Sequence, residues 1–418
     1  QYLKTKVDTQ NEEQLLELFK EGGENKFDTN ETNKILEALS EVKILDPACG
    51  SGAFPMGALH KIINALQKLD PDATWWKEKQ IENVPNALAK QMLKEKLDGE
   101  SADYVRKLGV IQNSIYGVDI QPIASEISKL RSFLSLVIDE TIIDDAENRG
   151  IQALPNLEFK FVTANTLIGL EEKQQAQGAF DFGQTDELQD QLKTIRNQYL
   201  QAYGDEKVKL KRDFEEVQNE IFKQEIAGGG QNKRALQLAS WNPFGNESNT
   251  WFDPYWMYGV EKFDIVIGNP PYVSVKSISK ELKQYFAQKY LSGKGRLNLY
   301  TLFIERGFNI LREKGVLGYI VPDNLYSNIE YRFTRKLLTE NTVLHKVCLF
   351  SKRVFEAAVD TAVIIFSKTI STENIINVSI DIKKDYSSII QEKIKKYPYY
   401  IMPIKARNEN LNLVNKIL

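Results

Sequence analysis

Cysteine and histidine are both scarce in this sequence. Its 418 residues include two cysteines, Cys49 and Cys348, and two histidines, His60 and His345. These are too few for a disulfide framework or for a zinc site built from Cys and His. We therefore expect no bound metal. A protein of the reducing cytoplasm is the simplest interpretation, because free cysteines persist there.

Long apolar stretches are also missing. The sequence has no run of about 18 apolar residues, so it predicts no membrane span. No basic and apolar leader with a small-residue cleavage site opens the chain, which argues against secretion. The first residue is Gln1, which is compatible with a start inside a longer protein.

An overall excess of positive charge, the usual sign of a nucleic-acid-binding protein, is absent. The formal net charge is −3 at pH 7. The distribution is uneven, because residues 273–356 contain fifteen Lys and Arg against seven Asp and Glu. A locally basic face can neutralise phosphates even on an acidic protein. An ordinary solvated face is the alternative interpretation.

Strands and helices alternate along most of the chain. Strands are predicted from short apolar runs bounded by Gly, Pro or Asp, and helices from apolar residues that recur every three to four positions. The expected strands cover 42–45, 114–120, 157–162, 263–268 and 315–321, followed by an antiparallel hairpin from 343–350 and 359–366. The expected helices include 53–69, 122–137 and 297–311. This alternation predicts a doubly wound α/β fold with a mostly parallel sheet.

The chain is too long for a single ordinary core. We expect a helical segment over 1–41, a main domain over 42–368, and a linker or the start of another domain over 369–418. Two charged stretches interrupt the main domain and are predicted as helical insertions, at about 70–112 and 171–240. The second is predicted to be a helical hairpin that breaks near Gly204.

Four polar segments follow predicted strands, and ligands of doubly wound sheets bind beyond the carboxyl ends of the strands. The first is Asp46-Pro-Ala-Cys-Gly-Ser-Gly-Ala-Phe54, which ends at a predicted helix. Gly50 and Gly52 allow a turn that approaches a ligand closely, and the helix start offers backbone N–H groups. The dinucleotide fingerprint needs a third glycine where Pro55 stands, so an NAD-binding site is disfavoured.

The second segment, 119–120, and the third, 163–167, could bind the nucleoside part of a ligand. Asp119 ends a predicted strand, where a carboxylate can accept both hydroxyls of a ribose. Ile120 could cover an adenine face, and Asn165 could hydrogen-bond an adenine edge. Each also has an ordinary interpretation: Asp119 as a strand-end residue, Ile120 as core, and Asn165 as a turn residue.

The fourth segment, Asn269-Pro270-Pro271-Tyr272, is the most informative. Its two prolines lack N–H donors and stiffen the turn. The side-chain oxygen of Asn269 and the carbonyl of Pro270 can then both accept hydrogen bonds from one exocyclic amine, which would orient its lone pair toward an electrophile. Tyr272 offers a stacking face. The alternative is a rigid loop, because Asn-Pro is also a common turn.

The first and fourth segments together resemble the S-adenosylmethionine-dependent DNA adenine-N6 methyltransferases, and their order resembles the gamma group. The runs Ile115-Tyr-Gly-Val-Asp-Ile120 and Asn298-Leu-Tyr-Thr-Leu-Phe303 resemble the methyltransferase part of type IIG (IIS-like) restriction-modification proteins. The resemblance covers about 42–368. It implies a Rossmann-like class I methyltransferase fold, with a seven-stranded, mostly parallel sheet that has one antiparallel strand. It also implies that 369–418 could begin a target-recognition domain.

The resemblance assigns roles to matching residues. Asn269, Pro270 and Tyr272 would form the catalytic loop, with Tyr272 stacking on the target base and Phe355 packing against it. S-adenosyl-L-methionine would be the cofactor. The implied cofactor-binding residues are Asp46, Ala48, Cys49, Gly50, Gly52, Asp119, Ile120, Asn165 and Leu167. Cys49 is interpreted as a loop residue and not as a nucleophile, because the methyl group would pass directly to adenine N6.

The implied partner is double-stranded DNA, from which the target adenine must be flipped at a cost of a few kcal/mol. A fused or separate nuclease and a target-recognition domain would complete a restriction-modification protein. Two other functions stay open. One is methylation of an RNA base or a protein glutamine, because Asn-Pro-Pro-Tyr loops serve there too. The other is a non-catalytic DNA-binding fragment.

Overall fold

The chain folds into two compact units. The computed structural model describes residues 1–406 and 410, except 9–10, 83–86, 141–143, 146–155, 173–182, 200–201, 203, 228–231, 246, 353–358 and 382–383. Unit 1 comprises Gln1–Asn11, Val42–Ala48 and Lys262–Leu418, and unit 2 comprises Glu12–Glu41 and Cys49–Glu261. Three separate segments of the chain therefore form unit 1, and the motif that begins at Asp46 runs from one unit into the other.

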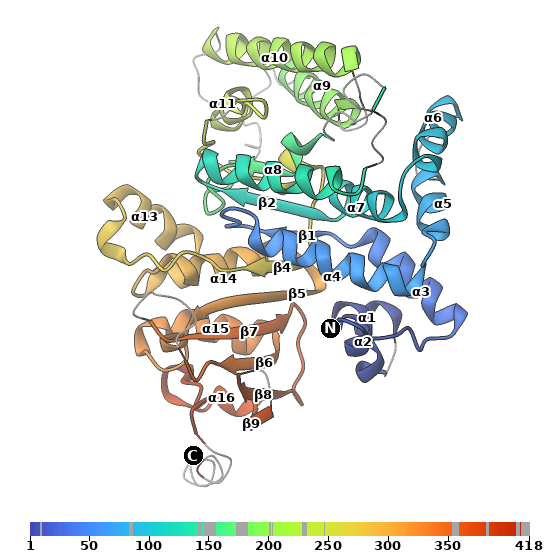
Figure 1. The fold of residues 1–418 in the computed structure, drawn as a ribbon. Coiled ribbons are helices and arrows are strands. Elements are labelled where there is room, and N and C mark those ends of the chain that lie inside the picture. The colour runs from blue at the N-terminus through green and yellow to red at the C-terminus, as the bar shows by residue number, and fades with distance from the viewer. Residues whose placement is uncertain are drawn as a thin grey trace. The chain divides into compact units, whose positions relative to one another are not determined.

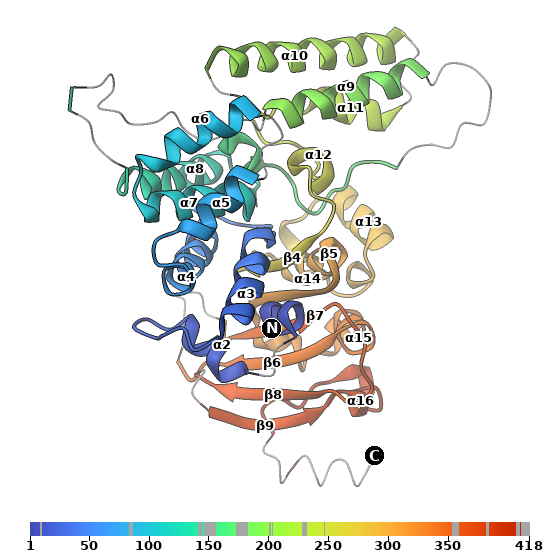
Figure 2. The same cartoon turned by 90° about the vertical axis from the view of Figure 1, so that its right-hand side faces the viewer.

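A large sheet forms the centre of unit 1, with the strand order β1-β4-β5-β7-β6-β8-β9 (Figures 1 and 2). Strands β1, β4 and β5 are parallel, and β7 runs antiparallel to its neighbours β5 and β6. The bounds are β1 Ile44–Asp46, β4 Phe263–Gly268, β5 Leu311–Pro322, β6 Val343–Leu349, β7 Thr361–Ser367, β8 Ile375–Ile380 and β9 Lys384–Ile390. The predicted strand at 263–268 and the antiparallel hairpin are confirmed.

The apolar composition of the central strands explains their position. Strand β4 reads FDIVIG, and its residues are buried or partly buried along its whole length. Apart from the buried Asp264, the strand is apolar, which is typical of a strand covered on both faces. Helix α14 (Leu299–Ile310) packs against β5, as expected from the apolar pattern at 297–311. The other helices of unit 1 are α1 Tyr2–Val7, α13 Lys280–Lys289, α15 Arg332–Asn341 and α16 Gln391–Ile394.

Strands β8 and β9 extend the sheet beyond the predicted main domain. Strand β8 pairs in parallel with β6, and β9 pairs antiparallel with β8. The described residues contain nine strands in all, two more than the seven expected. Strands β8 and β9 therefore belong to the sheet of unit 1. The idea that 369–418 begins a target-recognition domain stays a prediction.

Arg335 on α15 ties the C-terminal segment to unit 1. Its side chain is fully buried and donates hydrogen bonds to the carbonyls of Leu325 and Asn328 at 2.6 Å, Tyr399 at 2.9 Å and Tyr400 at 3.0 Å. Tyr399 and Tyr400 adopt φ angles of 56° and 57°, a conformation that costs energy for residues with a side chain. Burial lowers the pKa of Arg335 to about 10.

Unit 2 combines a parallel strand pair with helices. Strand β2 (Ile115–Asp119) pairs in register with β3 (Phe161–Thr163), so that Asp119 lies beside Thr163 at their carboxyl ends. Its helices are α2 Glu12–Leu18, α3 Thr29–Glu41, α4 Ala53–Leu69, α5 Thr74–Glu82, α6 Ala87–Asp98, α7 Ala102–Asn113, α8 Pro122–Val137, α9 Gly183–Tyr199, α10 Gly204–Ala227, α11 Lys233–Ser240 and α12 Pro254–Tyr258.

The bounds predicted for α4 and α8 are confirmed. The third strand was predicted too long, because Leu157–Phe159 forms a 3-10 turn ahead of β3. With parallel strands and helices in both units, the predicted α/β fold class is confirmed.

The stretch predicted as an inserted hairpin contains α9 and α10, and Gly204, at φ +56°, begins the second of these helices. Its base is an aromatic cluster whose interacting rings have centroids 5.0–6.0 Å apart. The cluster consists of Phe159, Tyr199, Phe214, Trp241 and Phe244. Because Phe159 immediately precedes β3, the hairpin packs on the body of unit 2. The stretch at 70–112 contains α5, α6 and most of α7, where one or two helices were expected.

Helix α8 packs with its small residues inward. The side chains that face unit 2 include Ala124, Ser125, Ser128 and Ser132. Its bulky apolar residues are exposed instead. The exposed residues are Ile123, Ile127, Leu130, Leu134 and, just after the helix, Ile138. In the part of the chain that is described, no helix is long and apolar enough to cross a membrane.

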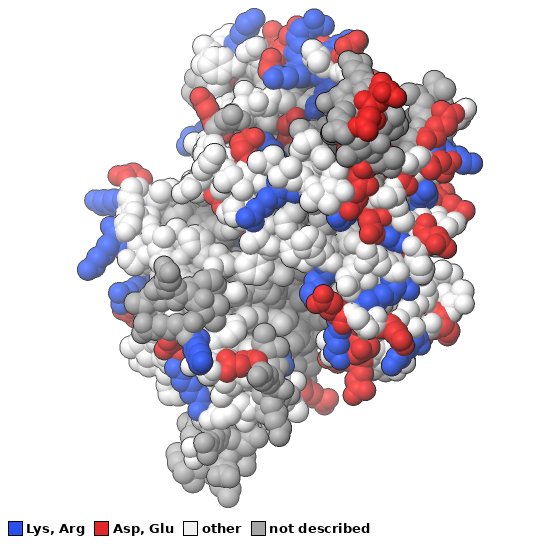
Figure 3. Space-filling model, viewed as in Figure 1, with Lys and Arg blue, Asp and Glu red and all other residues white. Residues whose placement is uncertain are grey.

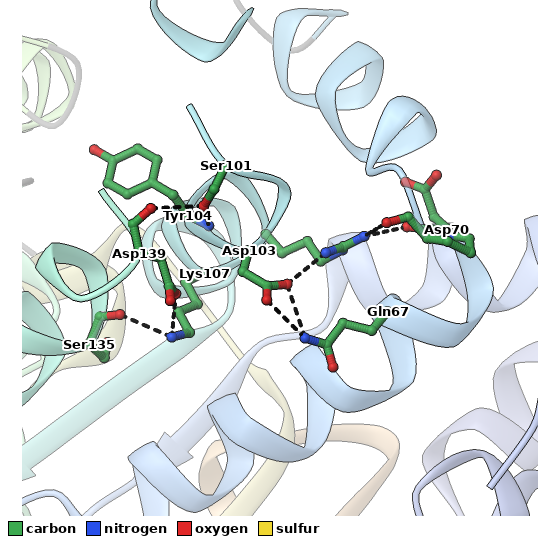
Figure 4. Close-up of polar contacts among 10 residues, drawn as sticks. Gln67, Asp70, Ser101, Asp103, Tyr104, Lys107, Ser135 and Asp139 are labelled. Atoms are coloured by element: carbon green, nitrogen blue, oxygen red, sulfur yellow. Dashed lines mark hydrogen bonds and ion pairs between the residues drawn. The ribbon is translucent and has the colours of Figure 1, made fainter. Parts of the chain in front are cut away.

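A buried arginine joins α4 to α7 (Figure 4). Arg106 donates to the carbonyl of Asp70 at 2.6 Å and to that of Pro71, just beyond the end of α4. Its guanidinium also pairs with Asp103 at 2.7 Å, and Asp103 accepts from Gln67 at 3.0 Å. A cation at a helix C-terminus is favourable because the last carbonyls carry partial negative charge. This polar cluster therefore holds α7 against the C-terminal end of α4.

Candidate active-site segments

The Asn269–Tyr272 loop begins where β4 ends. Strand β4 pairs with β1 so that Val266 lies beside Leu45, which brings the end of β4 next to Asp46. A side chain at Gly268 would place its Cβ only 2.5 Å from the Asp46 carboxylate. Glycine is therefore required immediately before Asn269, and the Asp46 carboxylate lies against the backbone that leads into the loop.

The hydroxyl of Tyr272 is hydrogen-bonded inside this loop. It lies 2.6 Å from Asn269 Oδ1 and 3.1 Å from the carbonyl oxygen of Ile320 on β5. The ring meets that of Tyr300 edge to face, with centroids 6.1 Å apart and planes at 87°. Burial raises the pKa of the Tyr272 hydroxyl to about 12, so it remains a protonated donor near neutral pH.

Asp46 and Ala48 form the start of the first motif in unit 1. The Asp46 carboxylate is buried and accepts a hydrogen bond from the backbone N–H of Ala48 at 3.1 Å. This is the local turn that Asp favours at the end of a strand. Complete burial, with a smaller contribution from the negative charge of Asp46, raises the pKa of Tyr319 on β5. The Asp46 carboxylate thus lies within the electrostatic reach of β5.

The turn at Cys49–Gly52 opens unit 2 and needs both glycines. Gly50 and Gly52 have φ angles of +54° and +82°, which other residues adopt at a cost. Gly50 has open space where a Cβ would be, whereas a Cβ on Gly52 would lie 2.9 Å from Ser128 Oγ. Gly52 precedes α4, so the free N–H groups of this helix start lie at the turn.

Asp119 holds the turn in place. Its Oδ2 accepts the N–H of Gly50 at 2.8 Å, and its Oδ1 accepts the N–H of Gln121 at 2.9 Å. Each carboxylate oxygen has a second lone pair, so both can still accept a hydroxyl. Ile120 is 56% exposed beside it. The structure therefore brings Gly50 and Asp119 together, with Ile120 next in the chain, and their contact with a cofactor stays a prediction.

Cys49 contributes through its backbone and not through its thiol. Its N–H donates to the carbonyl of Val118 at 2.8 Å, which joins the turn to β2. Its side chain is buried, with Sγ 3.9 Å from Ser128 Oγ. The interpretation of Cys49 as a loop residue agrees with this position. A direct contact between its side chain and a ligand has no support in the structure.

Asn165 and Leu167 follow β3. Asn165 Oδ1 accepts the N–H of Leu167 at 3.1 Å, so the turn role considered for Asn165 is present. No described group bonds the side-chain nitrogen of Asn165, which leaves that donor available. Leu167 is buried within unit 2, and its predicted cofactor contact stays a prediction. The predicted stacking residue Phe355 lies outside the described residues.

Sequence reasoning missed three groups at these segments. Ser128 limits the space behind Gly52, Tyr300 supports the Tyr272 ring, and the Ile320 carbonyl bonds the Tyr272 hydroxyl. Tyr300 lies inside the run 298–303 that carried the family resemblance, so its presence was noted without a role. A backbone carbonyl such as that of Ile320 has no signal in a sequence.

Comparison with known proteins assigns the chain to a family. The profile described as Eco57I restriction-modification methylase matches residues 113–355, which is more than half of the chain. The chain belongs to the Eco57I restriction-modification methylase family. The methylase match spans both units and includes Asp119, Asn165 and Asn269–Tyr272. The predicted resemblance to restriction-modification methyltransferases is thereby confirmed.

Individual relatives of this chain are longer proteins. RM.MjaORFECS2P of Methanocaldococcus jannaschii is 26% identical over 395 residues, which are 80% of this chain and 30% of that protein. The type II restriction enzyme and methyltransferase RM.Eco57I of Escherichia coli is 34% identical over 139 residues, 32% of this chain and 14% of its own. The chain thus spans less than a third of either relative.

A solved structure of the type I restriction enzyme EcoKI M protein matches 81% of this chain over 44% of its own length, with 12% identity and a TM-score of 0.37. The described residues contain no group of three or more His, Cys, Asp or Glu side chains that could hold a metal ion.

Proposed function

We propose that the chain is the modification part of a restriction-modification protein and methylates adenine N6 in double-stranded DNA, with S-adenosylmethionine as methyl donor. The Asn269–Tyr272 loop at the end of β4 carries this proposal, since it offers two acceptors and an aromatic ring in one rigid turn. Relatives named type II methyltransferases, such as M.BstVI and M.HincII, support it.

The loop suits a planar amine. Asn269 Oδ1 accepts one hydrogen bond from Tyr272 and has a second lone pair for an incoming N–H. The carbonyl of Pro270 supplies the other acceptor, and neither proline adds a competing N–H. An amine held by two acceptors presents its lone pair in a fixed direction, so positioning contributes much of the catalysis.

The residues around Asp119 fit the nucleoside part of S-adenosylmethionine. Both carboxylate oxygens can accept ribose hydroxyls, the space above Gly50 is open, and the exposed Ile120 can cover an apolar ring face. When bound, the cofactor would supply an electrophilic methyl group. The available side-chain nitrogen of Asn165 could donate to an acceptor on the adenine edge.

A lysine-rich surface in unit 1 suits the DNA backbone. Positive side chains gather over α13, which follows the catalytic loop in the chain (Figure 3). Lys276, Lys280 and Lys289 are exposed, Lys283 is partly exposed, and none of them forms an ion pair with a described residue. Glu281 is the acidic residue on this helix. Unpaired lysines of this kind neutralise phosphates and release counterions.

Exchanging two of these lysines tests the DNA surface. In Lys280→Gln/Lys283→Gln, the slope of log affinity for duplex DNA against log salt concentration should become shallower by about one to two units. Fluorescence anisotropy at several salt concentrations measures it. The matched variant Lys209→Gln/Lys223→Gln removes the same charge from exposed positions of α10 and should keep the slope. An equal change in both variants would refute α13 as the contact.

A methyl-transfer assay tests the proposed activity. The chain is incubated with S-adenosylmethionine that carries a tritiated methyl group and with genomic duplex DNA, RNA or a protein extract in parallel. We expect label in DNA, recovered as N6-methyladenine after digestion to nucleosides. Asn269→Ala should lose the activity, while Asn309→Ala, an exposed amide on α14, should keep it. Label recovered only in RNA or protein would replace the proposed substrate, and no label at all would favour a non-catalytic role.

The whole protein would need further parts to act as a restriction-modification system. A nuclease and a target-recognition domain, fused or separate, would cut the DNA and choose the site. If residues 1–418 methylate DNA without preference for a particular DNA sequence, this result would support a separate recognition domain that chooses the site.

A further inference from the structure

The Tyr272 hydroxyl faces two acceptors with a single proton. Asn269 Oδ1 lies at 2.6 Å and the Ile320 carbonyl at 3.1 Å, so the shorter contact to Asn269 is the main hydrogen bond. The ring cannot turn away freely, because the Tyr300 ring meets it edge to face. Two prolines between Asn269 and Tyr272 also restrict the backbone that connects them.

A carboxamide is useful to an amine in only one of its two orientations. The oxygen accepts an N–H, whereas the NH₂ group, which has nearly the same size, would repel it. A half-turn about the last side-chain bond exchanges the two. A hydroxyl can also accept from an NH₂ group, but here the Tyr272 hydroxyl donates to Asn269 Oδ1 at 2.6 Å, and this hydrogen bond holds the orientation with the oxygen in the loop.

We propose that the hydroxyl of Tyr272 is a positioning group that fixes the Asn269 carboxamide for the target amine. This inference rests on the proposed methyl transfer and adds a second role to Tyr272, whose ring would stack on the base. The hydroxyl occupies one lone pair of Asn269 Oδ1 and leaves the other for the amine.

Tyr272→Phe separates the two roles, since it keeps the ring and removes the hydroxyl. We expect kcat to fall about 3- to 10-fold, the size of one neutral hydrogen bond. The KM for DNA, the affinity for S-adenosylmethionine and the fluorescence of a 2-aminopurine placed at the target position should stay near wild type. Tyr326→Phe is the matched control, because the buried Tyr326 hydroxyl has no hydrogen-bond partner in the described part of the chain.

An aspartate at position 269 gives the sharper test. A carboxylate has two equivalent oxygens, so it needs no partner to select its orientation. In the Asn269→Asp background, Tyr272→Phe should therefore change kcat less than about twofold. A loss of equal size in both backgrounds would show that the hydroxyl acts on something other than the amide orientation. A kcat for Tyr272→Phe equal to or above wild type would overturn the inference outright.

The inference and the proposed function fail in different ways. Absence of methylation by the wild-type chain would refute the function. The side-chain amide resonance of Asn269, observed by NMR in asparagine-labelled protein, then decides the contact without any activity. It should shift or broaden in Tyr272→Phe and not in Tyr326→Phe. An unchanged Asn269 resonance in Tyr272→Phe would refute the positioning role.

Discussion

The Asn269–Tyr272 loop of unit 1 and the Cys49–Gly52 turn of unit 2 both follow a strand, but different groups fix them. In the loop, side chains do so: two prolines stiffen the backbone, and the Tyr272 hydroxyl bonds Asn269. The turn depends instead on Gly50 and Gly52, which lack side chains and adopt positive φ angles. The Asp119 carboxylate at the end of β2 accepts the backbone N–H of Gly50. The loop presents defined acceptors, whereas the turn leaves space. A substitution in one should therefore spare the other.

Asn269→Ala should have the largest effect. Loss of an acceptor aimed at the reacting amine should lower kcat at least about 100-fold, which is the usual cost of removing one preorganised polar group. Because the loop is fixed separately from the turn, the affinity for S-adenosylmethionine should stay within about twofold of wild type. Methyl transfer and isothermal titration calorimetry measure the two quantities. Weaker cofactor binding in this variant would break the proposed separation.

Asp119→Ala should show the reverse pattern. It removes the acceptor for the Gly50 and Gln121 N–H groups and two acceptor sites for ribose hydroxyls. We expect cofactor affinity to fall about 10- to 100-fold, the cost of one or two charged hydrogen bonds. Asp119→Asn keeps one oxygen and should lie between wild type and Asp119→Ala. Unchanged calorimetric binding would remove Asp119 from the cofactor site.

The two glycines of the turn should differ in their sensitivity. Gly50→Ala meets no neighbour, so its cost to stability should be limited to the positive φ, about 1–2 kcal/mol. Gly52→Ala carries a similar backbone cost and also forces Ser128 to move. Urea unfolding should therefore rank Gly52→Ala below Gly50→Ala in stability. The opposite ranking would contradict the close approach of Ser128 to Gly52 and the open space at Gly50.

The pH dependence of Tyr272 should give the smallest effect. Burial raises its pKa from 10.0 to about 12, so folding favours the protonated hydroxyl. Its contribution to stability is complete below pH 10 and is lost as the pH rises toward 12, because the unfolded chain releases the proton first. The difference in unfolding free energy between wild type and Tyr272→Phe should be constant up to about pH 10 and shrink above it. A difference that grows above pH 10 would contradict the direction of this shift.

Elements with strong local signals were predictable. The α4 and α8 bounds, the strand at 263–268 and the antiparallel hairpin followed from apolar spacing and from proline and glycine positions. The α8 orientation was not predictable, because apolar spacing identifies a helix without saying which face meets the sheet. Small serines fit closely against β2 and β3, which leaves Ile123 and Leu130 outward.

The site was predictable as segments but not as contacts. Asp119 with Gly50 follows from two strand ends that meet, as the sequence indicated. The bond from Tyr272 to Asn269, by contrast, depends on a side-chain rotation and on the Ile320 carbonyl, a backbone group that every residue possesses. Strands β8 and β9 were missed because their alternation is weak and their stability comes from pairing with β6.

The backbone carbonyls that accept hydrogen bonds from Arg335 limit how far the C-terminus of the chain can be shortened. A cut made after residue 390, at the end of β9, would remove the carbonyls of Tyr399 and Tyr400 and leave Arg335 with those of Leu325 and Asn328 alone. A buried charge that loses its partners typically costs 3–5 kcal/mol, a large share of the stability of a whole domain. The short turn Pro398–Tyr400 therefore covers the Arg335 guanidinium, and protein engineering that trims the C-terminus should stop beyond residue 400.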